Sequence, residues 1–355
     1  MFSLLSDTHP KIKEAAFSAL EQIGATVENP EIAKNVDVLI KALSNPFYEN
    51  QKGLEVLLKT DFAHSLDDSS LSIIMPIVNY GLIAQDAKSR EYAGKIVAKM
   101  SSLIKYPKSL HPYSDSLLMA LKSALADSRE DVRNTVAKAF GSIAKYLDRK
   151  FAEKIIEMLT EILHNPEAKT LERAGASQSL SEVLCCFGIE LVDKLLDSLL
   201  QDAKSPLSYL KEGYIGLFLF IPRILDEQFE PYLEKVLATI LASVAEEEEK
   251  IRQMALRVLH IIISKYGLKK VSILLPAFQK GIMSESWLER SSSVILLGNM
   301  FDILKEKDKN SIFKIDNISE VLVCLLILKS DPKPKVRDEA TNVLFSFFEA
   351  FTVFV

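Results

Sequence analysis

The stretch Asp127-Ser-Arg-Glu-Asp-Val-Arg133, continued by Val136, Phe140 and Ile143, is the clearest copy of a pattern that recurs nine times along the chain. A long polar residue, here called the anchor, is followed three and seven positions later by apolar or small residues. These offsets place both residues on one stripe of an α-helix. The anchors are Lys13, Gln51, Arg90, Arg133, Arg173, Lys211, Arg252, Arg290 and Arg337.

Neighbouring anchors are 38 to 47 residues apart. This period is too long for leucine-rich or tetratricopeptide repeats and fits HEAT or armadillo units. A HEAT unit pairs a first helix (A) antiparallel with a second helix (B), and the anchor pattern marks helix B. We therefore predict an all-α fold, an α-solenoid of about nine HEAT repeats. It would be a right-handed superhelix of antiparallel helix pairs that forms a single array over residues 1–355.

Apolar segments with helical spacing precede nearly every anchor and predict the A helices. The expected ranges are Glu31–Leu43, Ser69–Ala84, Ser114–Ala126, Phe151–Leu163, Glu190–Asp202, Tyr232–Val244, Lys270–Met283 and Ile318–Lys329. Gly24, Gly188 and Gly267 follow B-helix patterns, where a left-handed residue is least strained as glycine. No window sustains the alternation of a strand, so we expect essentially no sheet.

Neither end of the sequence carries a polar capping repeat. Only Met1–Asp7 precede the first anchor region, roughly two turns at about 3.6 residues per turn. The last B pattern runs into the aromatic residues Phe345, Phe347 and Phe348. Because solenoids need polar terminal repeats to stay soluble, we expect a piece of a longer array rather than a complete protein whose ends are covered by partners.

Composition excludes several classes of protein. The net charge of −5 argues against a chain that is basic throughout and wraps nucleic acid, although a local basic face remains open. The three cysteines form no CxxC pair and predict structural thiols in a reduced compartment. No signal peptide is recognisable, and the longest apolar stretches, Ile215–Ile221 and Val321–Leu328, are too short to span a membrane.

The sequence contains no pattern that indicates catalysis. It has no GxGxxG, Walker, GxSxG or HExxH motif, and none of its five histidines stands at a recognisable metal-ligand spacing. We therefore predict no enzyme activity, no catalytic residues, no cofactor, no metal site and no small-molecule substrate.

The anchor cations predict an electrostatic ladder. An acid stands six positions before five anchors, in the expected A–B turn. There it would meet the positive end of helix B and the anchor of its own or a neighbouring repeat. We expect this ladder to fix the stacking rather than to bind a ligand. Its predicted members are Arg90, Arg133, Arg173, Arg252, Arg290 and Arg337, with Asp127, Glu167, Glu246 and Asp331.

Three charged clusters leave alternatives open. The run Glu246–Glu249 lies at an expected A–B turn and is interpreted as a solvated turn, with a docking point for a basic partner as the alternative. Lys269-Lys270 and Lys145/Arg149/Lys150 lie at B-to-A connections. Solvated loops are the simpler interpretation, and contacts to ribosomal RNA phosphates are the alternative.

Three stretches go beyond a generic HEAT pattern. They are Leu171–Gly188, then Lys211–Pro222 with Phe229–Leu233, then Leu274–Ile282 with Trp287–Gly298. In this order they resemble the general-control translational activator family, large HEAT arrays that stimulate the general-control kinase acting on translation initiation factor two. The distinctive match covers roughly Pro166–Leu304. Glu289 departs from the pattern, because the residue before the anchor is usually apolar, as it is at Val132, Ile251 and Val336.

The resemblance implies a non-enzymatic cytoplasmic scaffold. Family members contact ribosomes and help the kinase to sense uncharged transfer RNA during amino-acid shortage, and one of their segments docks an RWD domain of the kinase. The resemblance identifies no partner-binding residue in this sequence.

Two other classes fit the same repeats. One is a nuclear transport receptor or a phosphatase scaffold of the HEAT type. The other is the HEAT region of a translation ATPase like elongation factor three, whose nucleotide cassettes would lie elsewhere, since no Walker motif occurs here.

Overall fold

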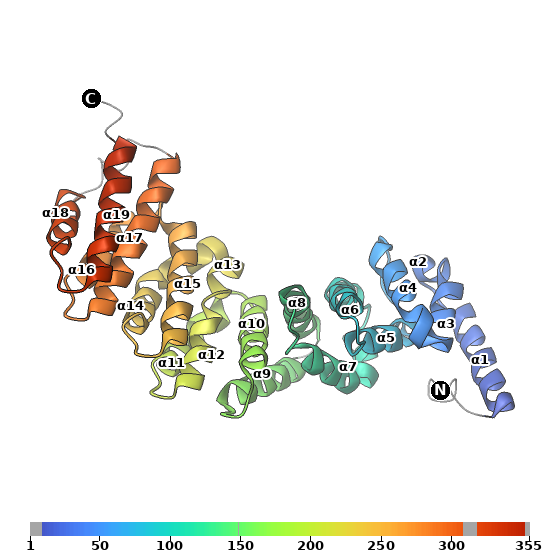
Figure 1. Cartoon of the computed structure of the whole chain (residues 1–355). Coiled ribbons are helices and arrows are strands. Elements are labelled where there is room, and N and C mark those ends of the chain that lie inside the picture. Colours follow the sequence, from blue (N-terminus) through green and yellow to red (C-terminus); the bar gives the residue numbers. More distant parts are fainter. Residues whose placement is uncertain (1–8, 148, 308–317, 352–355) are drawn as a thin grey trace. The chain divides into compact units, whose positions relative to one another are not determined.

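The computed structural model describes residues 9–147, 149–307 and 318–351, which form helices joined by short connections (Figure 1). Within these residues the only β pairing is an isolated parallel bridge between Leu66 and Ile104. The predicted all-α fold of paired helices is therefore confirmed. The chain divides into two compact units, Met1–Gly188 and Ile189–Val355, and each is described by itself.

In the first unit the B helices form one layer and the A helices pack on it. The B helices α4, α6, α8 and α10 each pack on the A helix that precedes them, and neighbouring B helices also pack on one another. The helices are α1 (Pro10–Ala25), α2 (Pro30–Ala33), α3 (Val36–Ser44), α4 (Pro46–Lys59), α5 (Asp68–Leu82), α6 (Ala87–Met100), η2 (Ser101–Leu103), η3 (Pro107–Leu110), α7 (His111–Ala124), α8 (Glu130–Tyr146), α9 (Arg149–His164) and α10 (Thr170–Cys186).

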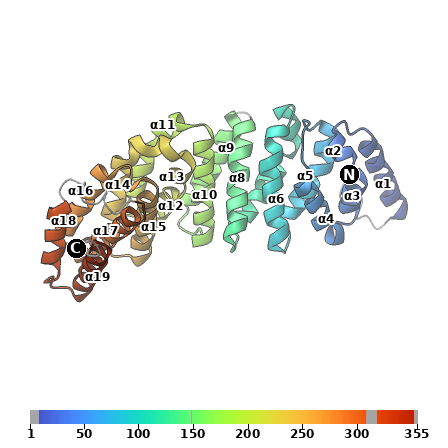
Figure 2. The same ribbon diagram turned by 90° about the horizontal axis from the view of Figure 1, so that it is seen from above.

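The second unit repeats the same pairing, which Figure 2 shows from above. Its B helix after α11 is interrupted at Phe218–Phe220 and restarts as α13, where Pro222 occupies the first turn and needs no backbone donor. The helices are α11 (Ile189–Ala203), α12 (Ser208–Leu217), α13 (Ile221–Leu225), η4 (Asp226–Tyr232), α14 (Leu233–Ser243), α15 (Glu249–Tyr266), α16 (Val271–Ile282), α17 (Trp287–Lys307), α18 (Ile318–Leu328) and α19 (Pro334–Phe351).

The predicted A helix Glu31–Leu43 is wrong as a single element. It divides into α2 and α3 at Lys34–Asn35. The side-chain amide of Asn35 donates to the carbonyl oxygen of Glu31 at 2.9 Å, a local bond of the kind that competes with helix continuation. The other predicted A helices agree with the observed ones to within three residues.

The predicted stripe is the core of both units. Every residue at the third position after an anchor is buried, including Val136 and Ala255, which are fully inaccessible. Every residue at the seventh position is buried except Leu58.

The pattern in α4 is displaced by one residue, so the predicted anchor Gln51 is wrong. Gln51 is exposed, whereas Asn50 is 4% exposed and its amide donates to the carbonyl oxygen of Ile77 at 3.0 Å. Leu57, seven residues after Asn50, is fully buried in the place expected for Leu58. Asn50, and not Gln51, is therefore the buried polar residue of this helix.

Of the three glycines expected at left-handed positions, only Gly188 adopts one, with φ +82°. Gly24 lies inside α1, and Gly267 caps α15 in the right-handed helical conformation, so both expectations are wrong. A different glycine serves close packing: a Cβ added at Gly175 of α10 would lie 2.0 Å from the carbonyl oxygen of Leu125.

Candidate interaction surfaces

The anchor arginines close the turn between helices A and B of their own repeat. The Nη1 of Arg90, Arg133, Arg252, Arg290 and Arg337 donates to two backbone carbonyl oxygens, those of the residues six and five positions earlier, at 2.5–3.2 Å. These carbonyls lie beyond the end of helix A, where backbone acceptors lack an intrahelical partner. One guanidinium therefore satisfies two acceptors of the turn, and we call this arrangement the turn clamp.

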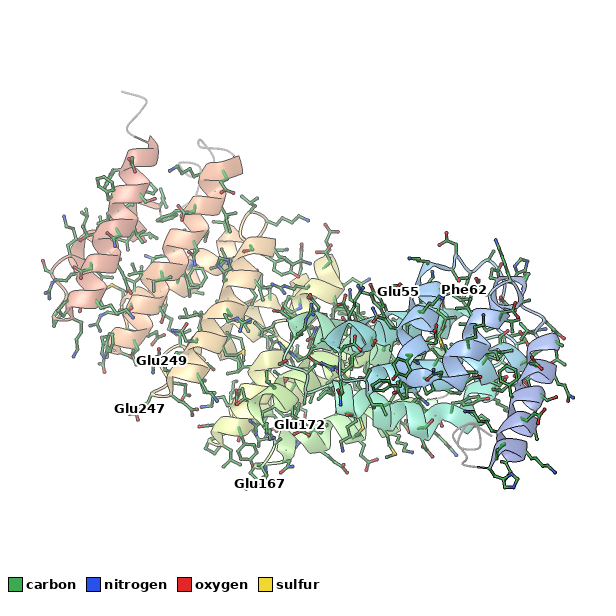
Figure 3. All side chains as sticks on the ribbon, turned by 45° about the vertical axis from the view of Figure 1, so that its right-hand side comes forward. Glu55, Phe62, Glu167, Glu172, Glu247 and Glu249 are labelled. Atoms are coloured by element: carbon green, nitrogen blue, oxygen red, sulfur yellow. The ribbon has the colours of Figure 1, made fainter. Side chains whose placement is uncertain are left out.

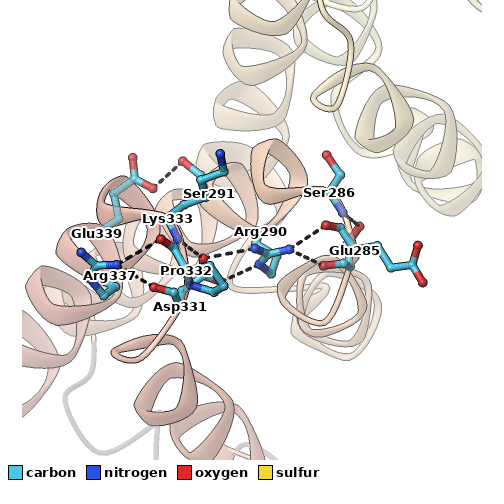
Figure 4. Close-up of polar contacts among 10 residues, drawn as sticks. Glu285, Ser286, Arg290, Ser291, Asp331, Pro332, Lys333, Arg337 and Glu339 are labelled. Carbon is cyan, nitrogen blue, oxygen red and sulfur yellow. Dashed lines mark hydrogen bonds and ion pairs between the residues drawn. The ribbon is translucent and has the colours of Figure 1, made fainter.

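Some anchors also reach the turn of the next repeat. Arg290 donates from Nε to Oδ2 of Asp331 at 2.7 Å and from Nη2 to Oδ1 at 3.1 Å (Figure 4). Arg90 donates from Nε to Asp127 at 2.5 Å. In both pairs the acid also accepts the backbone N–H two residues later, from Lys333 and from Arg129 respectively, at 2.8 Å. Each carboxylate thus accepts hydrogen bonds from the backbone of its own A–B turn and from the anchor arginine of the preceding repeat.

The pair Lys211–Glu246 supplies a third link that the predicted ladder did not include. The Lys211 ammonium lies 2.5 Å from Glu246 Oε1, and its side chain is 11% exposed. Lys211 stands at an anchor position, but the predicted ladder contains arginines as its only cations. Arg252, which the predicted ladder places with Glu246, donates to the backbone carbonyl oxygen of Glu246 and not to its carboxylate.

The structure does not bring Glu167 to an anchor. Glu167 is exposed, and the side chain of Asn165 takes the turn position by accepting the Glu167 N–H at 3.0 Å. Arg173 Nη2 donates to the carbonyl oxygens of Asn165 and Ala168, so this turn is longer than the others. Asp7, another expected acid, lies outside the described residues.

The structure shifts the pKa values of several buried or half-buried groups. The hydrogen bond from Arg290 lowers the pKa of Asp331 despite its burial. Burial raises the pKa of Glu182 in α10, and it raises those of Cys185 and Cys186 to about 12, so both thiols are protonated at neutral pH. The described residues hold no group of three or more His, Cys, Asp or Glu side chains arranged for a metal ion.

In the acidic run Glu246–Glu249 at the start of α15, Glu246 is ion-paired and the other three side chains are exposed. Glu246 pairs with Lys211, the carbonyl oxygen of Glu247 accepts from Arg252, and Glu249 lies in the first turn of the helix. Figure 3 shows Glu247 and Glu249 at the exposed end of this helix. This favours the solvated-turn interpretation.

The two basic clusters differ in their partners. Lys269 lies 2.5 Å from Glu227 Oε1 and Lys270 lies 2.8 Å from Glu230 Oε2, so both ammonium groups are neutralised by η4. In the other cluster, Lys145 and Lys150 are exposed and have no ion-pair partner among the described residues. This difference was not readable from the sequence, because the neutralising acids lie about forty positions away.

An open groove of about 530 Å³ lies between the A helices α14 and α16. Leu237, Leu241, Ile273 and Pro276 contribute its apolar lining. Glu289, the residue that departs from the repeat pattern, lies at this groove and accepts a hydrogen bond from Ser284 Oγ at 2.6 Å.

Among the helices that the structure describes, none combines the length and apolar character needed to cross a bilayer.

Two family models match the chain. Residues 49–154 match the elongation factor 3/GNC1 HEAT repeat, and residues 173–344 match the elongation factor 3 N-terminal HEAT repeat.

Curated relatives match more of the chain. It is 36% identical over 299 residues to the human "stalled ribosome sensor GCN1", a match that covers 84% of this chain and 11% of that protein. It is 33% identical over 297 residues to the "eIF-2-alpha kinase activator GCN1" of Saccharomyces cerevisiae, with the same coverage. The chain therefore spans about a tenth of the length of these relatives. Elongation factor 3 of Candida albicans is 28% identical over 140 residues, covering 39% of this chain and 13% of that protein.

Solved structures share the fold. Kap121p bound to Pho4p matches with a TM-score of 0.53 at 15% identity, over 99% of this chain and 38% of that one. Kap121p bound to RanGTP matches with a TM-score of 0.52 at 14% identity, over 98% of this chain and 38% of that one. At this identity the likeness concerns the helical-repeat architecture alone.

Proposed function

The chain belongs to the GCN1 family of general-control translational activators, and from this membership we propose that it serves a ribosome-associated scaffold that activates the eIF-2-alpha kinase. The observation that carries the proposal is the 33–36% identity to relatives from yeast and human over 84% of the chain. In this role the protein acts in the cytoplasm during amino-acid starvation, where it presents the kinase to the ribosome and catalyses no reaction itself.

The repeat architecture suits such work. A HEAT array offers long continuous surfaces along its helix faces and turns, which bind proteins or nucleoproteins. The turn clamps support this role, because at Arg90, Arg133, Arg252, Arg290 and Arg337 they tie an A–B turn to its B helix. The side chains of Arg90, Lys211 and Arg290 also reach the turn of the next repeat. Such ties keep a surface in one geometry, which reduces the ordering cost of binding.

A binding experiment tests the proposal. The tagged full chain is incubated separately with purified ribosomes and with the RWD domain of the kinase, and a Kap121p segment of similar length serves as a control with the same fold. We expect the chain, and not the control, to retain at least one of these two partners. Recovery of neither partner by a chain of normal helical content would contradict the proposal.

The HEAT region of an elongation-factor-three-like ATPase is the second candidate, since both family models carry that name. Its curated match covers 39% of the chain, against 84% for the GCN1 relatives. ATP-dependent release of the intact natural protein from ribosomes would favour this candidate.

A further inference from the structure

Four lysines of the first unit stand exposed at one edge, where B helices end and A helices begin. Lys105 and Lys108 follow α6, and Lys145 and Lys150 flank the connection from α8 to α9. In the part of the chain that the structure describes, none of the four is paired with a carboxylate, whereas the nearby Arg149 pairs with Glu153 at 2.9 Å. With Tyr106 and Tyr146, these lysines form what we call the basic edge.

The fold places these residues side by side. Successive B helices run in the same direction, so the C-terminal ends of α6 and α8 lie at the same edge of the unit, and packed helices are about 8–10 Å apart. The segment η2, which directly follows α6, packs against α8. The Leu66–Ile104 bridge pins the next residues, because the Lys105 N–H donates to the carbonyl oxygen of Leu66 at 3.3 Å.

Helix electrostatics accounts for only one of these cations. Lys145 lies in the last turn of α8, where the negative end of the helix dipole favours a positive charge. Lys150 lies in the first turn of α9, where the dipole disfavours it, and that turn contains no acidic residue. Lys105 and Lys108 lie outside the α-helices. Among the described residues, Lys108 and Lys150 therefore gain neither a carboxylate partner nor a favourable α-helix dipole.

The paired cluster in the second unit shows how this fold neutralises such lysines. Lys265, Lys269 and Lys270 stand at the corresponding end of α15, and each contacts an acid of η4 at 2.5–2.8 Å. At the basic edge the equivalent acids are lacking among the described residues. An unneutralised row of cations attracts polyanions, whose condensed counterions are released on binding.

Two exposed tyrosine rings accompany the lysines. Tyr106 is 60% exposed with the Lys105 ammonium 5.4 Å from its ring centre, and Tyr146 is 41% exposed with the Lys145 ammonium 5.5 Å from its ring centre. Aromatic rings beside cations let unpaired bases stack while the phosphates meet the ammonium groups. An acidic protein would use the lysines and leave the rings without a comparable role.

We propose that the basic edge binds single-stranded or looped RNA, with the lysines at the phosphates and the tyrosines under the bases. The inference rests on the proposed ribosome-associated function and assigns its RNA contact to the ends of α6 and α8.

The test compares two charge-matched double variants of the full chain. Binding of a fluorescein-labelled oligouridine is followed by anisotropy over a range of salt concentrations. Lys145→Gln with Lys150→Gln should weaken binding about tenfold and reduce the slope of log affinity against log salt by about 1.4, since each lost single-strand phosphate contact contributes about 0.7. Lys269→Gln with Lys270→Gln changes the net charge equally and should leave binding unchanged.

The stacking part has its own variant. Tyr106→Ala with Tyr146→Ala should weaken oligouridine binding at least about tenfold and leave the salt slope unchanged, because stacking releases no counterions. Circular dichroism should show wild-type helicity for every variant, since all the altered side chains are exposed or half-exposed.

The outcomes separate this inference from the proposed function. If both lysine variants weaken oligouridine binding equally, the RNA edge is overturned. It is also overturned if the chain binds polyglutamate as tightly as oligouridine and Lys145→Gln with Lys150→Gln weakens that binding. If wild-type chain sediments with ribosomes and the Lys145→Gln/Lys150→Gln variant sediments equally well, the edge is wrong and the proposed function stands. If wild-type chain binds oligouridine but neither ribosomes nor the RWD domain, the proposed function fails and the edge stands.

Discussion

The guanidinium of Arg290 joins two turns through the carboxylate of Asp331. Two of its nitrogens, Nε and Nη2, donate to that carboxylate at 2.7 and 3.1 Å, and Nη1 donates to carbonyl oxygens in the preceding turn at 2.8 Å. The side chains are 14% and 4% exposed, so water screens the pair less than it screens a surface ion pair. The planar fork of arginine matches both sets of acceptors at once.

Arg290→Lys should therefore destabilise the second unit although it keeps the charge. One ammonium cannot reproduce four donated hydrogen bonds, and a hydrogen bond to a charged group contributes about 1.5–3 kcal/mol. We expect a loss of about 1–3 kcal/mol in urea unfolding. Arg257→Lys, at an exposed position of α15, is the matched control and should change stability by less than about 0.5 kcal/mol. Equal effects of the two substitutions would refute the clamp.

The Asp331 carboxylate should make stability depend on acid pH. Its pKa in the folded chain is lowered, chiefly by the hydrogen bond from Arg290. A lowered pKa contributes stability that is fully present above the ordinary value of about 3.9 and is lost as the pH falls through the lower folded value. The stability difference between wild type and Asp331→Asn should shrink as urea unfolding is repeated from pH 6 down to pH 2. A difference that stays constant over this range would show that the carboxylate charge plays no part.

Leu57 and Leu58 test the one-residue displacement in α4. Leu57 is fully buried and Leu58 is half-exposed. Leu57→Ala should cost about 2–5 kcal/mol because it removes a buried side chain and leaves a cavity, whereas Leu58→Ala should cost less than about 1 kcal/mol. Thermal unfolding of the two variants gives the order directly. The reverse order would restore Gln51 as the anchor.

Gly175 should not tolerate a side chain. The Cβ of an alanine there would lie 2.0 Å from the backbone oxygen of Leu125, so α10 must move away from its neighbour. Gly188→Ala is the comparison, because nothing lies within 4 Å and the cost comes only from its φ of +82°. We expect Gly175→Ala to lower the melting temperature clearly more than Gly188→Ala does, and equal shifts would show that the helices are not in close contact.

The anchor pattern predicted the helix pairs and most of the core because it depends on local periodicity. The pattern did not predict that Asn50 is buried, because its hydrogen-bond partner, the carbonyl oxygen of Ile77, lies 27 residues away. The spacing of six residues before Arg173 predicts Glu167 for the turn, but Asn165 takes that position in a longer turn. The contrast between Lys145 and Lys269 depends on acids that only the packed repeats bring together.

The most direct measurement of the account is sedimentation of the full chain with purified ribosomes through a sucrose cushion at increasing salt. We expect the chain to pellet with ribosomes at about 50 mM salt and to be released progressively towards about 200 mM, as phosphate contacts require. A correctly folded chain that stays in the supernatant at every salt concentration would contradict the ribosome-associated role.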